Sequence, residues 1–362
     1  MRIALIGDGE SVHLLKWATA LNAASDVELW AASSRGFLTA FDRVIPPQRR
    51  LALATRPAHG GGNGAILLTL PALGSWLRRL DADWLHAHYL TSHGTLAWLA
   101  RSVLRSRARI VGSAWGSDIL VAPQRSAIDR WVIRRVLKAC TLATSDSQHM
   151  TRRMQALGAG EVMTFPFGLE SMPTCPQAKD DWLFYANRGL EAPYRPDRVL
   201  QAFAAISARR PEARLVVAND GALRQPMEAL ASTLGLRVGP LESGARVCFV
   251  GRLDAAAQSR WYARSRWYLS LPETDSVSVS VLEAMAHGCI PVLSDLPANR
   301  ELVVDGQNGA ILADSRPPLG ALEELLAKAD LVAAANRGWV EEHALFGPAV
   351  DRFLARLREL SP

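Results

Sequence analysis

Residues 269–295 of the chain, LSLPETDSVSVSVLEAMAHGCIPVLSD, constrain the fold more than any other stretch. An apolar strand ends at a proline, a loop with Asp275 follows, and a helix carries Glu283 as far as Gly288. A second apolar run, residues 290–293, comes directly after that glycine. This order predicts two parallel strands joined by a helix. Both carboxylates are then expected at the carboxyl edge of the sheet, where open α/β sheets bind ligands.

Short apolar runs alternate with helical patterns along all 362 residues, and a chain of this length exceeds one ordinary core. The polar segment 168–181 interrupts the alternation and marks a linker. We therefore predict an α/β protein with two doubly wound, Rossmann-like domains, residues 1–168 and 169–345. Single helices are expected over residues 94–104, 319–336 and 348–360, and a flexible glycine-rich tip over residues 60–64.

Three loops share the carboxyl edge expected for the first domain, at residues 7–11, 86–89 and 115–118. The first, GDGES, lacks the third glycine of a dinucleotide-binding fingerprint, so it indicates close backbone approach to a ligand rather than NAD binding. The nearby histidines lack the further ligands of a metal site, and His13 is explained equally well as an ordinary helix residue. The candidate cleft residues are Gly9, Glu10, His13, His88, Trp115 and Asp118, whereas His86 is expected to pack in the strand.

The loop after the first strand of the second domain, residues 187–195, contains Arg188 and Arg195. An arginine offers permanently charged, paired donors that suit a diphosphate. Residues 219–224, NDGALR, form another turn between strand and helix. Asn219 and Gly221 in this turn are either ligand contacts or parts of a tight turn.

The net charge of +6 is spread unevenly. Residues 1–168 hold 20 Lys and Arg against 11 Asp and Glu, a net charge of +9. This excess predicts either solvated helix faces or contact with an anionic membrane surface. Nucleic acid is disfavoured because no nucleic-acid-binding motif accompanies the charge.

The remaining bulk features indicate a cytoplasmic protein. The N-terminal apolar run, residues 3–6, reads as a first strand rather than a signal peptide, and no apolar span approaches the ~18 residues of a membrane helix. Four scattered cysteines predict reduced thiols and no metal site. They are Cys140, Cys175, Cys248 and Cys289.

Several motifs, taken in their order along the chain, resemble the retaining glycosyltransferase family 4, whose fold is GT-B. The acidic residue followed by EAMAHGCIPV, from Asp275 to Val292, is similar to the signature of that family. LHAHYLTSHG, SAWGSDIL, ATSDSQHM, NDGALR and ELVVDGQNG stand in the order that the family uses. The resemblance covers most of the chain. It implies two Rossmann-like domains that face a central cleft.

The resemblance also implies roles for individual residues. Glu283 would hold the ribose of a nucleotide-sugar donor, Asp275 would approach the sugar, and Arg188 would bind the diphosphate. The first domain would bind the acceptor, and residues 346–362 would cross back onto that domain. Together with Asp275 and Arg188, the pocket residue His88 is expected to be catalytic. No cofactor or metal is implied, because the nucleotide sugar is a co-substrate and arginine supplies the positive charge. Further donor contacts would come from Ser276, Val277, Ser278, Val279 and the start of the helix with Glu283.

The chain departs from this family at three positions. The family has glutamate where this chain has Asp275, so either the sugar contact changes or Glu273 compensates. Tyr194 stands where the family has a lysine at the diphosphate, and Arg195 is the candidate replacement, with a different reach. Trp115 stands where the family often has histidine near the reacting sugar.

We therefore expect a metal-independent, retaining glycosyltransferase that moves a sugar from a nucleotide sugar to a glycan, a lipid-linked precursor or a small molecule. Synthesis of cell-surface polysaccharide or glycolipid is the expected setting, in the cytoplasm and peripheral to the membrane. One alternative is a GT-B protein that binds a nucleotide or glycan without catalysis. Another is a nucleotide-sugar epimerase of the same overall fold.

Overall fold

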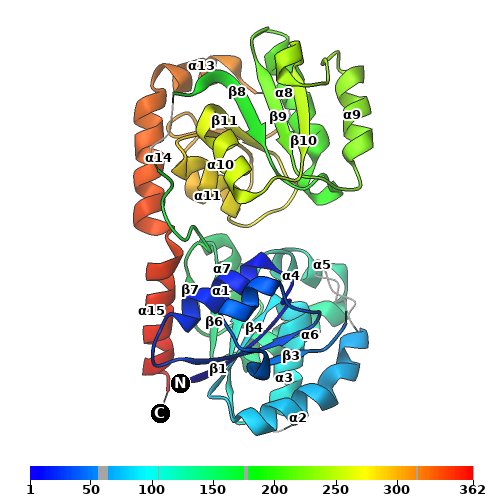
Figure 1. The fold of residues 1–362 in the computed structure, drawn as a ribbon, viewed down its shortest axis with the longest axis vertical. Helices are drawn as coiled ribbons and strands as arrows, with labels where there is room; N and C mark the ends of the chain where they lie inside the picture. Colours follow the sequence, from blue (N-terminus) through cyan, green and yellow to red (C-terminus); the bar gives the residue numbers. More distant parts are fainter. Residues whose placement is uncertain (56–63, 105, 175–177, 315–316, 362) are drawn as a thin grey trace. The chain divides into compact units, whose positions relative to one another are not determined.

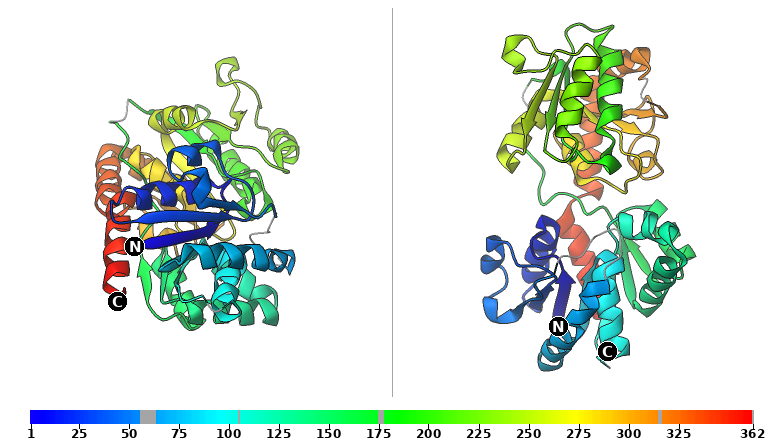
Figure 2. Two further views of the ribbon diagram at one scale, coloured as in Figure 1. Left: turned by 60° about the horizontal axis from the view of Figure 1, so that its bottom comes forward. Right: turned by 90° about the vertical axis from the view of Figure 1, so that its right-hand side faces the viewer.

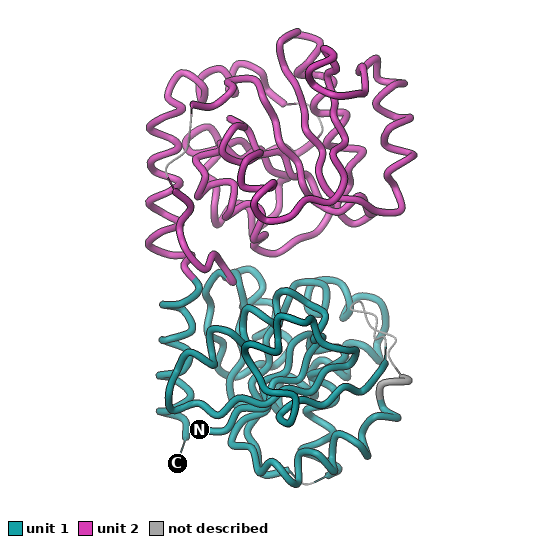
Figure 3. Tube along the Cα trace, in the orientation of Figure 1, with its two compact units in different colours: residues 1–166, 346–362 teal, residues 167–345 magenta. Residues whose placement is uncertain are grey.

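The computed structural model describes residues 1–55, 64–104, 106–174, 178–314 and 317–361. The chain divides into two compact units (Figure 3). Unit 1 consists of Met1–Pro166 and Phe346–Pro362, and unit 2 is Phe167–Leu345. None of the described helices is long and apolar enough to cross a membrane.

Unit 1 contains a seven-stranded parallel sheet in the order β3-β2-β1-β4-β5-β6-β7 (Figure 1). Its strands are β1 (Arg2–Gly7), β2 (Glu28–Ser33), β3 (Arg50–Ala52), β4 (Trp84–His88), β5 (Arg109–Ser113), β6 (Leu142–Ser145) and β7 (Val162–Thr164). The α-helices of this unit are α1 (Val12–Asn22), α2 (Leu70–Leu80), α3 (Thr95–Ser102), α4 (Ser117–Leu120), α5 (Ala122–Arg125), α6 (Ala127–Ala139), α7 (Gln148–Ala156) and α15 (Phe346–Glu359). Short 3-10 segments, η1 (Thr39–Arg43), η2 (Pro47–Arg49) and η3 (Gly64–Thr69), precede α2, and a π-helix, η4 (Tyr89–Gly94), follows β4.

Serine side chains define where several helices of unit 1 begin. Ser11 accepts a hydrogen bond from the backbone N–H of His13, and Ser126 and Ser147 each accept one from the third residue after them. Such caps satisfy N–H groups that have no partner inside the helix. The same serines end the loops at the carboxyl edge of the sheet, so they fix those loops as well.

Unit 2 contains a six-stranded parallel sheet in the order β10-β9-β8-β11-β12-β13. Its strands are β8 (Asp180–Ala186), β9 (Arg214–Ala218), β10 (Val247–Gly251), β11 (Ser265–Ser270), β12 (Ile290–Ser294) and β13 (Ala310–Leu312). Its helices are α8 (Pro196–Ser207), α9 (Arg224–Thr233), α10 (Ala255–Arg264), α11 (Val279–Ala286), α12 (Asn299–Leu302), α13 (Leu319–Ala327) and α14 (Ala329–His343), with 3-10 turns η5 (Ala192–Tyr194) and η6 (Leu241–Ser243).

Helices cover both faces of the sheet of unit 2 (Figures 1 and 2). Consecutive side chains of the central strands therefore point to opposite faces of the sheet, and each face has its own apolar core. Phe184 and Trp267 pack on one side, and Tyr185 and Tyr268 on the other. Burial on both faces is typical of parallel sheets and confirms the predicted α/β class with two doubly wound, Rossmann-like domains.

Two predicted helices differ from the structure. The predicted helix 319–336 is two helices, α13 and α14, because Lys328 between them has a φ of −117° and leaves helical geometry. Its ammonium donates to the carbonyl of Gly306 at 2.9 Å, which stabilises the break. The predicted helix 94–104 begins only at Thr95, because residues before it form the π-helix η4.

The predictions for the cysteines and for the glycine-rich tip fall partly outside the described residues. Cys140, Cys248 and Cys289 are free thiols in the part of the chain that the structure describes. Cys175 lies outside the described residues, as does most of the predicted glycine-rich tip.

The C-terminal helix α15 belongs to unit 1. Trp17 of α1 is fully buried and meets Phe346 and Phe353 edge to face, at centroid distances of 5.0 and 5.3 Å. Arg356 pairs with Glu161 at 2.6 Å, but this ion pair is exposed and therefore weak. Burial of the aromatic rings thus holds α15 in place.

We predict that Phe353→Ala destabilises unit 1 by about 3–5 kcal/mol, because it removes a fully buried ring from this cluster. Denaturant unfolding would measure the loss, and hydrogen exchange would locate it in α1, β1 and α15. Leu331→Ala, at a position that is 75% exposed on α14, is the control. Equal effects of the two substitutions would contradict the assignment.

Candidate functional site

Arg188, directly after β8, is the centre of the polar groups at the carboxyl edge of unit 2. Its Nη2 atom lies 2.7 Å from Oδ2 of Asp275, and Nη1 donates a hydrogen bond to the hydroxyl of Ser278. The guanidinium lies over the ring of Tyr194, 4.4 Å from the centroid. Burial disfavours its charge, but Asp275 and neighbouring tyrosines outweigh burial, so the pKa of Arg188 lies above its usual range. The side chain is a fixed cation.

Asp275 is oriented by its own loop and by Arg188. Its Oδ1 atom accepts the backbone N–H of Ser276 at 3.0 Å. Its Oδ2 atom is buried and accepts no hydrogen bond of good geometry, although Nη2 of Arg188 is close. Burial raises the pKa of the Asp275 carboxyl, and the positive charge of Arg188 partly opposes this rise. The pair therefore has a carboxylate oxygen with spare hydrogen-bonding capacity.

The loop 276–279 leads into α11 beside this pair. Ser276, Val277 and Ser278 are buried, and Val279 is the first residue of the helix. The side chain of Ser278 binds Arg188 and does not cap α11. Backbone N–H groups at a helix start attract anions, so this loop and Arg188 together form a positively polarised edge.

Glu283, one turn into α11, is held by a buried tyrosine. The hydroxyl of Tyr262 on α10 donates to Oε2 of Glu283 at 3.0 Å and accepts from Nδ2 of Asn187 at 2.8 Å. Oδ1 of Asn187 in turn accepts from the hydroxyl of Tyr268 at 2.8 Å. Burial raises the pKa of Tyr262 well above its usual value, so its hydroxyl remains a donor. The network connects Glu283 to the residue preceding Arg188.

Arg195, the candidate second diphosphate contact, is paired with acidic neighbours. Its guanidinium makes two hydrogen bonds to Asp197, at 2.9 and 2.7 Å, and lies 3.9 Å from Glu273. Its backbone has a φ of 46° at the start of α8. Arg195 thus has a local partner, whereas Tyr194 supports Arg188.

Asn219 and Gly221 occupy a tight turn between β9 and α9. Asn219 has a φ of 80° and donates through Nδ2 to the carbonyl of Asn187 at 3.3 Å. A Cβ atom on Gly221 would lie 2.4 Å from the carbonyl oxygen of Leu190. The close approach of the two loops therefore accounts for the glycine, and the turn supports the loop that carries Arg188.

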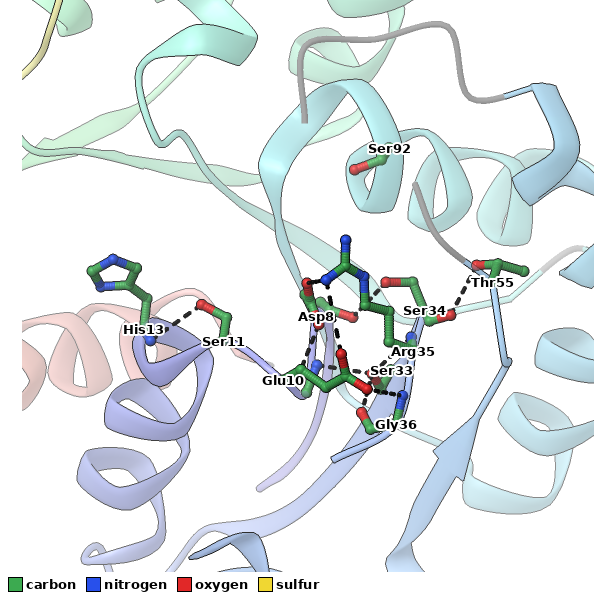
Figure 4. A network of polar contacts seen from close by, with 12 residues as sticks. Asp8, Glu10, Ser11, His13, Ser33, Ser34, Arg35, Gly36, Thr55 and Ser92 are labelled. Carbon is green, nitrogen blue, oxygen red and sulfur yellow. Dashed lines mark hydrogen bonds and ion pairs between the residues drawn. The ribbon is translucent and has the colours of Figure 1, made fainter. Parts of the chain in front are cut away.

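In unit 1, the loops after β1 and β2 are fastened to each other (Figure 4). The backbone N–H of Gly9 donates to Ser33 at 2.8 Å, and a Cβ atom at this glycine would lie 2.5 Å from the carbonyl oxygen of Gly36. Arg35 lies 3.5 Å from Asp8 and 3.8 Å from Glu10. Gly9 and Glu10 thus help to fix the loops after β1 and β2 against each other.

Three neighbouring histidines of unit 1 are buried. Burial lowers the pKa of His86 to about 3, and burial and the neighbouring histidines hold the pKa of His88 well below its usual value. His86 contacts the hydroxyl of Ser113 at 2.7 Å, and the ring of His93 bonds to the carbonyl of His88 at 2.7 Å. Among the described residues, no group of three or more His, Cys, Asp or Glu side chains is arranged to hold a metal.

Trp115 belongs to an aromatic cluster at the same edge. Its indole N–H donates to Nδ1 of His88 at 3.3 Å, which leaves the hydrogen of the neutral imidazole on Nε2. Its ring stacks on Tyr89 at 5.8 Å and contacts His13 at 4.8 Å. Tyr89 has a φ of 63°, a strained conformation for a bulky residue, at the start of the π-helix. Both features recur at functional sites.

Asp118 is fully buried beneath this cluster. Its carboxylate accepts the backbone N–H groups of Leu90 and Trp115, at 2.9 and 3.0 Å. Burial raises its pKa, and these N–H groups oppose the rise. Asp118 therefore positions the loops around it, and through Leu90 it binds the π-helix η4 directly.

Sequence reasoning did not identify Tyr262, Tyr89 or Arg35 as functional candidates. Tyr262 lies on the buried side of its helix, where the sequence pattern predicts a core residue. The one signal for a further role is that a buried tyrosine hydroxyl needs a hydrogen-bond partner. The strain at Tyr89 and the position of Arg35 depend on contacts with loops far away in the sequence.

Comparison with known proteins identifies two family models on the chain. The model described as "Glycosyl transferase 4-like" matches residues 2–147, and that described as "Glycosyl transferases group 1" matches residues 175–333. EpsD of Bacillus subtilis (strain 168), a protein named as a glycosyltransferase, is 27% identical over 155 residues. This match covers 42% of the chain and 38% of EpsD.

Solved structures resemble almost the whole chain. HepE of Anabaena, in complex with UDP, has a TM-score of 0.75 at 14% identity, covering 98% of this chain and all of HepE. Sucrose-phosphate synthase of Thermosynechococcus elongatus has a TM-score of 0.73 at 16% identity and full coverage of both chains. The lipopolysaccharide outer core galactosyltransferase WaaB has a TM-score of 0.68 at 14% identity, covering 98% of this chain and 99% of WaaB. These likenesses show the GT-B fold.

The buried histidines generate a pH prediction. Below about pH 6.5 the unfolded chain binds a proton at His86, whereas the folded protein does so only near pH 3. Stability therefore falls as the pH drops through this window, by about 1.4 kcal/mol per pH unit for one such histidine. His86→Phe should reduce the slope of unfolding free energy between pH 6 and 5 by about that amount.

Denaturant titrations at several pH values measure this slope. Ser113→Ala is the matched control, because it removes the hydrogen bond of His86 but keeps the imidazole. It should change the stability without changing its slope. An unchanged slope in His86→Phe would show that this histidine does not contribute to acid destabilisation.

Proposed function

We propose that this chain, a glycosyltransferase with the GT-B fold, transfers a sugar from a uridine diphosphate sugar to an acceptor with retention of anomeric configuration. The observation that carries the proposal is the position of Arg188 between Asp275 and the start of α11, which bears Glu283. The structure of HepE with UDP supports uridine as the base. The resemblance of the sequence motifs to retaining enzymes supports retention.

In this proposal the diphosphate binds at Arg188 and at the N–H groups of residues 276–279. Arg188 supplies paired donors and a permanent charge, and the helix start adds further positive potential. Both stabilise the negative charge that develops on the leaving diphosphate. Because the protein supplies this charge, we propose that transfer needs no metal ion.

Asp275 has two roles in succession. Without a donor it neutralises Arg188 at 2.7 Å. The incoming diphosphate competes for the same guanidinium, so its binding releases Asp275 toward the sugar. The free carboxylate then stabilises positive charge that develops on the sugar ring.

Glu283 would accept hydrogen bonds from the ribose hydroxyls. The hydroxyl of Tyr262, which donates to Oε2 of Glu283, would keep the carboxylate oriented. Asn219, Gly221 and Arg195 act from the periphery of this donor site. Arg195 reaches the diphosphate only if it exchanges Asp197 for the ligand.

We assign the acceptor to the carboxyl edge of unit 1. The stacked rings of Trp115 and Tyr89 offer flat apolar surfaces, and His88 offers a neutral donor close to them. A glycan or lipid-linked acceptor is supported by the name of WaaB, a lipopolysaccharide galactosyltransferase. We place the enzyme in the cytoplasm, peripheral to an anionic membrane, on the support of its free thiols and of the charge of +9 on residues 1–168.

The pairing of Arg195 with Asp197 favours one alternative, a GT-B protein that binds the nucleotide sugar without transferring the sugar. Incubation with UDP-glucose, UDP-galactose and UDP-N-acetylglucosamine, with and without extracted glycans and lipids, separates the two functions. The transferase releases UDP and extends an acceptor. Tight binding with neither product would establish the alternative.

We predict that Glu283→Ala weakens binding of the UDP-sugar about ten- to a hundredfold, because it removes hydrogen bonds to a charged acceptor. Titration calorimetry with the folded variant measures this change. Glu242→Ala, an equal truncation on an exposed turn of unit 2, is the control. Unchanged affinity in Glu283→Ala would exclude the ribose role.

Asp275→Asn tests the competition at Arg188. The substitution keeps the shape but removes the negative charge, so UDP should bind as tightly as before or up to roughly tenfold more tightly. Turnover should fall by roughly a hundredfold or more, because the transition state loses a charged partner. Weaker UDP binding with normal turnover would contradict both roles.

A further inference from the structure

The outer face of α6 in unit 1 combines apolar and basic side chains. Ile133, Val136 and Leu137 face the core. On the opposite face Ile128 is 74% exposed and Trp131 is 51% exposed. These two residues share one helical stripe with Arg135 and Lys138, at the spacing of successive turns. The helix is therefore amphipathic with a mixed outer face rather than a purely polar one.

Trp131 is held in its outward position by neighbours. Trp98 of α3 meets it edge to face at 6.0 Å, and the guanidinium of Arg135 lies 5.3 Å from its ring centroid. Arg101 of α3 donates to the carbonyl of Ala139, at the end of α6, at 2.9 Å. The two helices thus form one supported surface.

This surface is strongly basic. Asp129 is the only acidic residue of α6. Exposed basic side chains lie on α6 itself and on α5 and α3, which contact it. They are Arg101, Arg125, Arg130, Arg134, Arg135 and Lys138.

We infer that this face, centred on Ile128, Trp131, Arg134 and Arg135, docks the protein onto an anionic lipid bilayer. The proposal gives the membrane partner of the proposed function a defined surface. Arginines would contact lipid phosphates, while the isoleucine and the indole enter the boundary between headgroups and acyl chains. A nucleic acid offers the phosphates but no apolar layer for an exposed isoleucine, so the bilayer fits the face better.

The location of α6 suits an acceptor that comes from the membrane. The helix follows β5 through α4 and α5, and Arg130 near its start donates to the carbonyl of Pro123 at 3.0 Å. In an α/β unit the helix starts near the carboxyl edge of the preceding strand. Ile128 and Trp131 therefore lie toward the edge that carries Trp115 and Tyr89, where a lipid-linked sugar would arrive.

Flotation of the full chain with vesicles tests the proposal without any substrate. We expect the protein to bind vesicles of phosphatidylcholine with 30% phosphatidylglycerol at low salt, and to leave them in 0.5 M NaCl. Ile128→Ser combined with Trp131→Ser should lower the partition coefficient at least fivefold, and Arg134→Glu combined with Arg135→Glu at least tenfold. All four positions are exposed, and circular dichroism checks that the variants remain folded.

Arg209→Glu combined with Arg237→Glu is the matched control, because it changes the net charge equally on exposed positions of unit 2. This variant should bind vesicles almost as the unaltered protein does. If the control variant lost as much vesicle binding, the effect would be explained by net charge alone, and the proposal would be overturned. Equal binding to pure phosphatidylcholine, or binding to RNA but not to anionic vesicles, would overturn it too. UDP binding by the same variants stays normal, so the outcome is independent of the donor site.

Discussion

The contact between Arg188 and Asp275 is the constraint on which the carboxyl edge of unit 2 depends. A largely buried guanidinium such as that of Arg188 needs a negative partner, because removing one charge from such a pair leaves the other without compensation. Here the partner comes from a loop that is remote in sequence but adjacent on the sheet, since β8 and β11 pair directly. The parallel order of strands thus brings a cation and a carboxylate to one edge. A ligand with its own negative charge can replace the carboxylate without leaving the arginine unpaired.

Neighbouring side chains fix the position of this pair. The guanidinium of Arg188 lies over the ring of Tyr194 and donates a hydrogen bond to the hydroxyl of Ser278. The hydrogen-bonded set of Asn187, Tyr262 and Tyr268 connects the loop of Arg188 to Glu283. Fully connected buried networks of this kind favour one arrangement of side chains. This edge of unit 2 therefore has one preferred arrangement of side chains, and in the proposed function Asp275 is the member that changes its partner when the donor binds.

In unit 1, buried polar side chains hold the loops at the carboxyl edge of the sheet. Asp118 binds two backbone N–H groups, and neutral histidines pack between aromatic rings. These groups leave the stacked pair Tyr89 and Trp115 at the edge of the sheet. In the proposed function this flat apolar surface binds the acceptor sugar, and strand and helix patterns do not reveal the residues that form it.

The sequence predicted the architecture because apolar periodicity and glycine stops act locally. The strand, helix and second strand predicted within residues 269–295 are β11, α11 and β12, and the helix predicted over residues 348–360 is α15. Contacts that close over long sequence distances could not be predicted in this way. The pairing of Arg188 with Asp275, the strain at Tyr89 and the helix break at Lys328 all depend on such contacts.

A crystal structure of the protein with bound UDP would show whether the diphosphate displaces Asp275 from Arg188. We predict diphosphate oxygens within about 3 Å of the Arg188 guanidinium, ribose hydroxyls on Glu283, and an Asp275 side chain that has left the arginine. UDP bound elsewhere, or bound while Arg188 and Asp275 keep their contact, would contradict this prediction.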